Sequence, residues 1–258
     1  KEGETIKLVA DEYNEAVTID VPNVTILGPN AGLSGLDGTR GAEAVIKAVI
    51  TITKNAGGIV IDGLSFTGAA KIVYKDAATF DGFVFQNNKV YDTNKATVAW
   101  DESRYALPGF IQFTNSSSSG QVHNIEILNN SFVNVSEINV LANRVNNLSV
   151  DGNLFKDFDL DAIRTEGGYC YGILSFTNNV FEQTVAESAS TGIFLYSIAG
   201  GSSAQPTTVV IKNNEFIKLG MNNGSVFTGA ICAYRFQENI TSILIEENVF
   251  DHCYDYIY

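Results

Sequence analysis

Acidic side chains alternate along one short segment in the middle of the chain. Asp157, Asp159 and Asp161 are each separated by a single residue, and an extended backbone directs alternate side chains to the same side. Because Ca²⁺ takes carboxylate oxygens as ligands, the trio is a candidate calcium site. The segment lacks the glycine and the bidentate glutamate of an EF-hand loop, however, and the chain as a whole is acidic. A solvated acidic corner is therefore the favoured alternative.

A second group of side chains has the chemistry of a saccharide-binding face. Five apolar segments can be aligned so that a polar or aromatic residue recurs at the fourth position, which a period of two predicts to point outward. Tyrosine rings pack on the C–H surfaces of sugars, and Arg and Gln bind hydroxyl groups. The ligand-binding residues predicted from these and the adjoining segments are Gln112, Asn143, Arg144, Arg164, Tyr169, Tyr196, Tyr234, Arg235, Trp100 and Tyr105.

Two alternatives to this face stay open. The second position of each aligned segment is also apolar, so a register slip of one residue would bury the predicted set. Trp100 and Tyr105 belong to the largest insertion, residues 92–108. An insertion with aromatic and charged residues is typical of a binding loop, but Trp100 could equally fill a gap beneath that loop.

A recurring Asn-x-Phe motif identifies the elements that must position these side chains. Each copy follows a short run of β-branched or aliphatic residues, and the step from Phe132 to Phe155 is 23 residues while the others are longer. A fixed motif with a minimum spacing and a variable excess predicts a solenoid with insertions. The copies are Asn130-Ser131-Phe132, Asn153-Leu154-Phe155, Asn179-Val180-Phe181, Asn214-Glu215-Phe216 and Asn248-Val249-Phe250, with Leu64-Ser65-Phe66 and Asn88-Lys89-Val90 as weaker copies upstream.

The repeat predicts two internal columns. In a solenoid of parallel strands each strand lies on its equivalent one turn away, so equal positions stack. The five phenylalanines should form an interior aromatic column. The five asparagines should form an amide column at a corner, where Asn tolerates the left-handed conformation of a tight turn. A structural role is thus favoured over a catalytic one for these asparagines.

Composition predicts one folded, all-β domain spanning residues 1–258. The chain is 45% hydrophobic, rich in Gly, Asn, Val, Ile and Phe and poor in Met and Pro, which favours strands and tight turns. The formal charge of −13 and the lack of basic runs argue against nucleic acid. No apolar run is long enough for a membrane span. The three cysteines match no zinc pattern, and their odd number argues against a disulfide framework.

The segment from residue 3 to residue 32, GETIKLVADEYNEAVTIDVPNVTILGPNAG, resembles the opening coils of secreted right-handed parallel β-helix proteins of the pectin-lyase-like superfamily. The later copies of the repeat resemble the middle coils of these proteins. The resemblance covers nearly the whole chain and implies a right-handed parallel β-helix and a secreted or cell-surface location. It leaves the activity open, because this architecture hosts lyases, hydrolases, esterases, adhesins and phage tailspikes.

The resemblance also implies what catalysis would need. Lyases of this fold use Arg or Lys as a base, often with calcium, to remove a proton next to a carboxylate. Arg164 is the candidate base here, with Glu166 and Asp161 beside it. The signature stretches of pectin methylesterases, polygalacturonases and classical pectate lyases are absent.

We therefore expect a non-catalytic extracellular module that binds a polysaccharide or a cell-surface glycan, without a cofactor unless calcium binds. The alternative is a polysaccharide lyase or glycoside hydrolase that acts along the same face. The last residues, Tyr254 to Tyr258, are predicted to form one more strand. An open β-helix end exposes unpaired backbone groups, so a further domain or self-association is expected to cover it.

Overall fold

The computed structural model describes residues 1–53, 55–74, 80–93, 109–113, 122–136, 138–166, 170–186, 190–196, 198, 206–220, 228–234, 240–254, 256 and 257. This described part contains 26 strands and no helix. All of its strand pairs are parallel, and they form three sheets, which we name A, B and C.

The strands follow one another from sheet A to B to C and back again. Sheet A contains β1 (Thr5–Lys7), β4 (Thr25–Leu27), β7 (Ile59–Asp62), β10 (Phe80–Gln86), β13 (Val122–Leu128), β16 (Val145–Asp151), β19 (Tyr171–Thr177), β22 (Thr207–Lys212) and β25 (Ile240–Glu246). Sheet B contains β2 (Asp11–Tyr13), β5 (Ala44–Ile46), β8 (Ser65–Gly68), β11 (Lys89–Thr93), β14 (Ser131–Val133), β17 (Leu154–Lys156), β20 (Val180–Glu182), β23 (Glu215–Ile217) and β26 (Val249–Asp251). Sheet C contains β3 (Val17–Ile19), β6 (Val49–Ile52), β9 (Lys71–Tyr74), β12 (Gly109–Phe113), β15 (Ile138–Asn143), β18 (Asp161–Glu166), β21 (Thr191–Tyr196) and β24 (Gly229–Tyr234).

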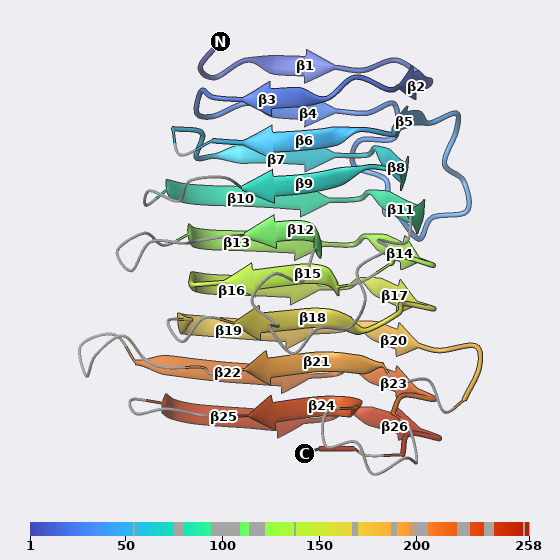
Figure 1. The fold of residues 1–258 in the computed structure, drawn as a ribbon, viewed down its shortest axis with the longest axis vertical. Coiled ribbons are helices and arrows are strands. Elements are labelled where there is room, and N and C mark those ends of the chain that lie inside the picture. Colours follow the sequence, from blue (N-terminus) through green and yellow to red (C-terminus); the bar gives the residue numbers. More distant parts are fainter. Residues whose placement is uncertain are drawn as a thin grey trace.

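Each coil before the last thus adds one strand to each sheet, and successive coils stack from the N-terminal to the C-terminal end (Figure 1). The last coil, with β25 and β26, meets sheet C through an isolated parallel bridge between Ile231 and Ile257. The predicted parallel β-helix is confirmed. The first three strands, β1, β2 and β3, lie in three different sheets and form the three sides of the first coil, and β4 begins the next coil by pairing with β1. Short β-branched strands with buried inner faces account for this architecture, because every inner face packs against the other two sheets.

The phenylalanine column is confirmed in the interior. The rings of Phe132, Phe155, Phe181, Phe216 and Phe250 stack one on the next, with centroids 4.8, 5.2, 4.9 and 5.2 Å apart and planes within 10° of parallel. The first four side chains of this column are fully buried. Offset stacking of this kind adds to the stabilisation that comes from removing the rings from water.

The asparagine column is also confirmed. The Nδ2 of Asn130 donates to Oδ1 of Asn153 at 2.9 Å, and Asn153 donates in the same way to Asn179 at 3.0 Å. The left-handed residues are not these asparagines, however, but the residues just before them, such as Asn129 (φ 56°) and Gly152 (φ 67°). The predicted left-handed role of the column asparagines is therefore wrong by one position, because their amides must point inward to stack.

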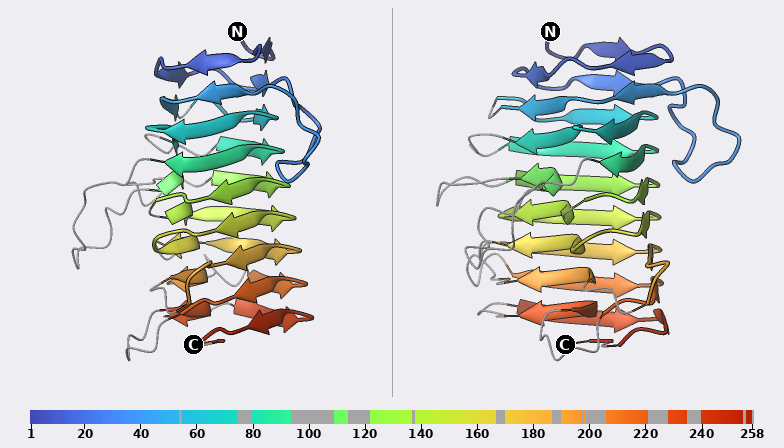
Figure 2. Two further views of the ribbon diagram at one scale, coloured as in Figure 1. Left: turned by 90° about the vertical axis from the view of Figure 1, so that its right-hand side faces the viewer. Right: turned by 45° about the vertical axis from the view of Figure 1, so that its right-hand side comes forward.

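A long loop between β4 and β5 binds along the asparagine corner of several coils. We call residues 28–43 the strap; it projects beside the first coils in Figure 2. Its Gly35 N donates to the Asn129 carbonyl at 2.8 Å. Arg40, whose side chain is 1% exposed, pairs with Glu43 and donates to the Asn87 carbonyl at 2.6 Å. These contacts join the strap to the corners of later coils, at Asn87 and at Asn129.

Candidate functional site

The outer face of sheet C differs from the other outer faces in its burial. On sheet A, strands such as β13 and β16 alternate between buried and more exposed residues. On sheet C, β15 and β21 are buried at every residue except the last. The inner residues Val140, Ile163 and Ile193 belong to the main hydrophobic core, whereas the buried Leu141 and Phe194 between them do not. The outer side chains of β15 and β21 therefore belong to a second buried layer on sheet C, whereas β6 and β9 of the same sheet alternate.

The strand register arranges the predicted ligand-binding residues in two rows. One row on the outer face of sheet C is largely buried, and we call it the inner row. Its members lie level with one another on successive strands: Gln112, Leu141, Arg164, Phe194 and Cys232. Asn143 lies level with Glu166, and Tyr196 with Tyr234, in an outer row two residues further along each strand. The predicted alignment placed Arg164 and Gln112 together with Asn143 and the tyrosines. This alignment was wrong, because Gln112 and Arg164 lie two positions earlier along their strands than Asn143, Tyr196 and Tyr234. A shift of two residues leaves all five side chains on the outer face of sheet C but gives each of them different neighbours on the adjoining strands.

Arg164 is held by a buried ion pair. Its Nη1 donates to Oδ2 of Asp161 at 3.0 Å, and the two residues are only 3% and 7% exposed. Removing both charges from water is costly unless they compensate each other, so the geometry of this pair is tightly constrained. A guanidinium ordinarily stays protonated. Arg164 is therefore placed to support its neighbours more than to act as an accessible base.

Arg164 also lies beneath an aromatic cluster. Its guanidinium carbon is 4.6 Å from the ring centroid of Phe194 and 5.8 Å from that of Tyr196. The Tyr196 ring in turn stacks on Tyr234 one coil further on, with centroids 5.7 Å apart and planes 21° from parallel. A cation over a ring face is attracted by the ring quadrupole. The cluster thus runs along the helix axis across three coils, from β18 through β21 to β24.

The stacking decides what the tyrosines present to a ligand. Arg164 lies on one side of the Tyr196 ring and Tyr234 on the other, so both faces of that ring are occupied. Tyr196 and Tyr234 are half-buried. A ligand therefore meets ring edges and hydroxyl-bearing ends at Tyr196, where the sequence predicted an open ring face.

Cys232 follows Arg164 and Phe194 in the inner row and is buried. Burial, together with the nearby Asp161 carboxylate, raises the pKa of its thiol to about 12. The thiol is therefore protonated at neutral pH. Because the thiolate is the nucleophilic form of cysteine, Cys232 is not a nucleophile under these conditions. Cys232 therefore packs as a small apolar side chain.

The remaining predicted ligand-binding residues fall at the edge of the face or outside the described part. Gln112 and Asn143 are half-buried, and Arg144 occupies the left-handed corner that follows β15 (φ 56°). Trp100, Tyr105, Tyr169 and Arg235 lie outside the described residues. Glu166 is the last residue of β18, but only its backbone is described.

The three alternating aspartates do not converge. Asp157 occupies a left-handed corner, where its carboxylate accepts hydrogen bonds from the backbone and hydroxyl of Thr184 at 2.7 and 2.8 Å. Asp159 is exposed, and Asp161 turns into sheet C to meet Arg164. Within the described part, no three His, Cys, Asp or Glu side chains form a group that could hold a metal ion.

Sequence reasoning missed Phe194 and Leu141 as parts of this face. Both are apolar, and an apolar residue in a strand ordinarily predicts a place in the core. The available signal was the presence of apolar residues at both alternating positions of the same segments. This pattern is typical of a strand that is covered on both faces.

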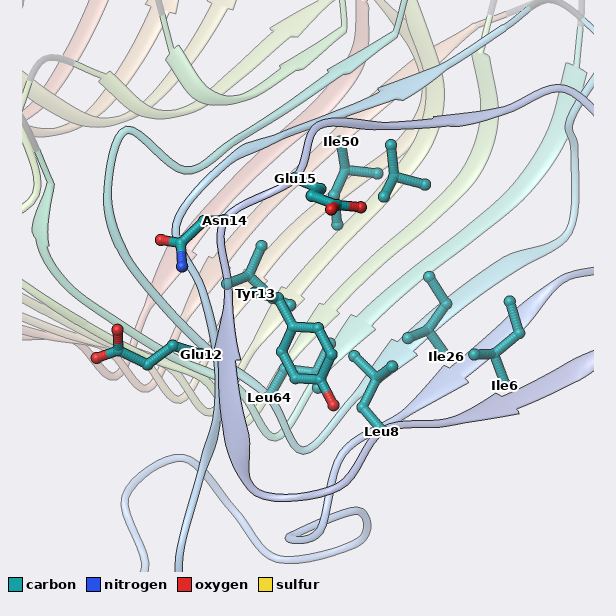
Figure 3. Close-up of a pocket in the computed structure, with 11 residues that line it drawn as sticks. Ile6, Leu8, Glu12, Tyr13, Asn14, Glu15, Ile26, Ile50 and Leu64 are labelled. Carbon is teal, nitrogen blue, oxygen red and sulfur yellow. The ribbon is translucent and has the colours of Figure 1, made fainter.

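A hollow of about 510 Å³ opens at the N-terminal end of the stack, where the core of the first coil is uncovered. The apolar side chains of Ile6, Leu8 and Ile26 gather around Tyr13, and Glu12 points away from them (Figure 3). This hollow is the open end of the hydrophobic interior and has few converging polar groups. It does not resemble a saccharide site.

The fold and the site together define the chain as a parallel β-helix with a covered outer face on one sheet. A family model described as "Disaggregatase related" matches residues 176–257, about a third of the chain. The matched part includes Tyr196 and Tyr234 and ends within the last coil. No curated protein and no solved structure matches the sequence. No helix in the described part is long and apolar enough to cross a membrane.

Proposed function

We propose that the protein is an extracellular β-helix module that binds carbohydrate, or a glycan-bearing cell-surface partner, on the outer face of sheet C. The observation that carries this proposal is the half-buried Tyr196–Tyr234 stack supported by the buried Arg164–Asp161 pair. A buried ion pair that packs against two aromatic rings holds the rings in position, and the hydroxyl groups of the rings remain available to a ligand. Ligand sites need this kind of rigid support.

The outer row has the chemistry of a saccharide site. Its described side chains are the amide of Asn143 and the phenols of Tyr196 and Tyr234, which donate and accept hydrogen bonds at the ends of flat apolar rings. These groups are uncharged, so the ligand does not need a charge of its own. The net charge of −13 disfavours strongly anionic polysaccharides.

Substitution of the stack tests the proposal directly. Tyr196→Ala and Tyr234→Ala should each weaken binding of a neutral polysaccharide about tenfold or more, because aromatic residues dominate the binding energy of such surfaces. Affinity electrophoresis against soluble glucans, mannans and xylans gives the measurement. Tyr91→Ala is the matched control, since Tyr91 is also half-buried but lies on sheet B. If the wild-type protein is retarded by none of the polysaccharides, or if all three variants bind equally, the proposal is wrong.

The second candidate function is a polysaccharide lyase or glycoside hydrolase. It is favoured by the acid–base groups of β18: Asp161, Arg164 and Glu166. Arg164 is buried and paired, so catalysis on this face would require the ligand to reach Glu166 or to displace Asp161. Release of reducing or unsaturated sugar ends, lost in Glu166→Gln but retained in Glu182→Gln, would support the enzyme. An absence of any released sugar from the full panel would exclude it in favour of the binding module.

A further inference from the structure

A second concave site lies on the outer face of sheet A, away from the candidate site. It is a hollow of about 340 Å³ over the middle of β13, β16 and β19. This volume is at the small end of the range for ligand sites, which begins at roughly 300 Å³. The side chains that line it are Asn124, Glu126, Asn147, Ser149, Ile173 and Ser175.

The hollow arises from a change of side-chain size along one outer row. The register places Val84, Glu126, Ser149, Ser175 and Val210 level with one another on five successive coils. Valine at both ends and serine in the middle leaves a depression two coils wide, because the serine side chains are shorter. Glu126, which is exposed, closes one end of the depression.

One wall of the hollow is held by a second amide ladder. Asn124 and Asn147 are left-handed (φ 55° and 58°), and Nδ2 of Asn147 donates to Oδ1 of Asn124 at 3.0 Å. The Oδ1 of Asn147 accepts from the backbone N of Ile173 at 3.0 Å. The register also shifts between Asn146 and Leu148 in the pairing of β16 with β19. Ile173 is therefore fixed in position although its side chain is 57% exposed.

The floor and one end of the hollow carry polar side chains that can still form hydrogen bonds with a ligand. The side chains of Glu126, Ser149 and Ser175 make no hydrogen bond or ion pair within the described part of the chain. The three residues lie level on neighbouring strands, which are about 4.8 Å apart. Ile173 adds a fixed apolar surface on the side of this row. A line of acceptors and hydroxyl groups beside an aliphatic surface is the pattern that a sugar ring satisfies with its hydroxyls and C–H bonds.

From this geometry we infer that the hollow on sheet A is a second saccharide-binding site, specific for uncharged sugar units. Glu126 accepts hydrogen bonds from sugar hydroxyls, Ser149 and Ser175 exchange hydrogen bonds with them, and Ile173 packs against the ring. A uronate or sulfated sugar would place its charge beside Glu126 and is disfavoured. A basic peptide would engage Glu126 alone and leave both serines unmatched, so the sugar fits the whole lining better.

This inference does not rest on the site on sheet C. The two sites share no residue and lie on different sheets, so either can exist without the other. If both bind, one molecule engages two glycan chains, which raises its overall avidity for a polysaccharide matrix.

The test follows the methyl signal of Ile173, which the ligand would contact. Protein labelled at the isoleucine δ1 methyl groups is titrated to millimolar concentrations with cello-, manno- and chito-oligosaccharides, and separately with an oligolysine peptide. At least one oligosaccharide is expected to shift the Ile173 methyl with saturation. The double variant Ser149→Val, Ser175→Val should abolish this shift by filling the hollow. It should fold normally, because valine already occupies the same row at Val84 and Val210.

Three further variants separate the possible outcomes. Glu126→Gln should weaken the sugar about tenfold, because it removes a charged hydrogen-bond acceptor. Ser131→Val, the same change on sheet B, should leave the Ile173 shift intact, and so should Tyr234→Ala on sheet C. An Ile173 methyl that no oligosaccharide shifts would overturn the inference, as would a shift caused only by oligolysine. A shift that survives filling of the hollow would place the sugar elsewhere and would overturn it equally.

Discussion

At the scale of single residues, most buried polar side chains in the described part of this protein form hydrogen bonds or ion pairs with other polar groups. Asparagine amides bond to asparagine amides, and Arg164 is paired with Asp161. Such matching is expected, because an unsatisfied polar group in the interior costs about 1–3 kcal/mol. Arg164 shows why residue type alone misleads. An arginine on a predicted binding face is a candidate base by residue type, whereas the structure places Arg164 in a buried pair with Asp161, under the rings of Phe194 and Tyr196.

Asn139 is an exception to this matching, and replacing it should not destabilise the protein. The residue is fully buried in β15, yet neither Nδ2 nor Oδ1 has a hydrogen-bond partner. The equivalent positions on neighbouring coils are Ala162, Gly192 and Ala230. Asn139→Ala is therefore expected to leave the free energy of unfolding unchanged or to raise it by about 1–3 kcal/mol.

Chemical denaturation of the Asn139 variant beside Asn153→Ala provides the measurement. The comparison is informative because Asn153 donates to Asn179 and to the Ile127 carbonyl, so its loss leaves several groups unpaired. Asn153→Ala should be destabilising by more than about 2 kcal/mol. Equal destabilisation by both substitutions would contradict the distinction drawn here.

The pH dependence of stability should report on Glu43. Burial raises the pKa of the Glu43 carboxyl, but the hydrogen bond and charge of Arg40, together with hydrogen bonds from Asn30 and Ser65, outweigh burial and hold the pKa below its ordinary value of 4.5. An acid whose pKa is lowered by folding stabilises the native state at pH values above 4.5, and this contribution is lost as the pH falls through the lowered value. The stability difference between wild type and Glu43→Gln should therefore shrink between pH 6 and about pH 3. If denaturation curves across this range show a constant stability difference between the two proteins, ionisation of Glu43 does not contribute to folding as described.

At the scale of elements, the strap is the feature that the sequence showed least clearly. The glycines between Gly32 and Arg40 predict only a loop, whereas the structure binds residues 28–43 along the asparagine corner through Gly35, Arg40 and Glu43. The partners of Gly35 and Arg40 at Asn129 and Asn87 are distant in sequence. No local pattern indicates which backbone carbonyls a loop will meet, so this docking could not be predicted.

Gly35 should be a sensitive position in the middle of the strap. A Cβ atom there would lie far inside van der Waals contact of the Asn88 carbonyl oxygen and 2.8 Å from the Ser131 backbone N. Because both obstacles are backbone atoms, Gly35→Ala is expected to displace the strap at a cost of about 1–3 kcal/mol. Gly38→Ala is the matched control, since a Cβ at Gly38 meets no atom within 4 Å. Thermal unfolding and limited proteolysis of both variants provide the check, and equal behaviour would show that the strap is not tightly docked.

At the scale of the whole molecule, each coil contacts chiefly the coils before and after it. In such a solenoid, stability is close to a sum of coil and interface terms, so the ends open before the middle. All of β1 is exposed, and β25 is exposed at four of its seven residues, whereas β14 and β17 centre on fully buried phenylalanines. Amide hydrogen exchange should therefore be fastest in the first and last coils and slowest between β13 and β20. Uniform protection along the chain would indicate that the coils unfold as a single unit.

The sequence by itself determined the coil, its two internal columns and the choice of sheet face. These features repeat at every turn, and a repeated pattern of inward residues admits only one way of burying all copies together. The tertiary structure decided which outward residues share a level, which of them are covered, and where the strap and the hollow on sheet A lie. Those features depend on register between strands 20 to 40 residues apart and on contacts between distant segments, and neither is encoded in the local alternation of side chains.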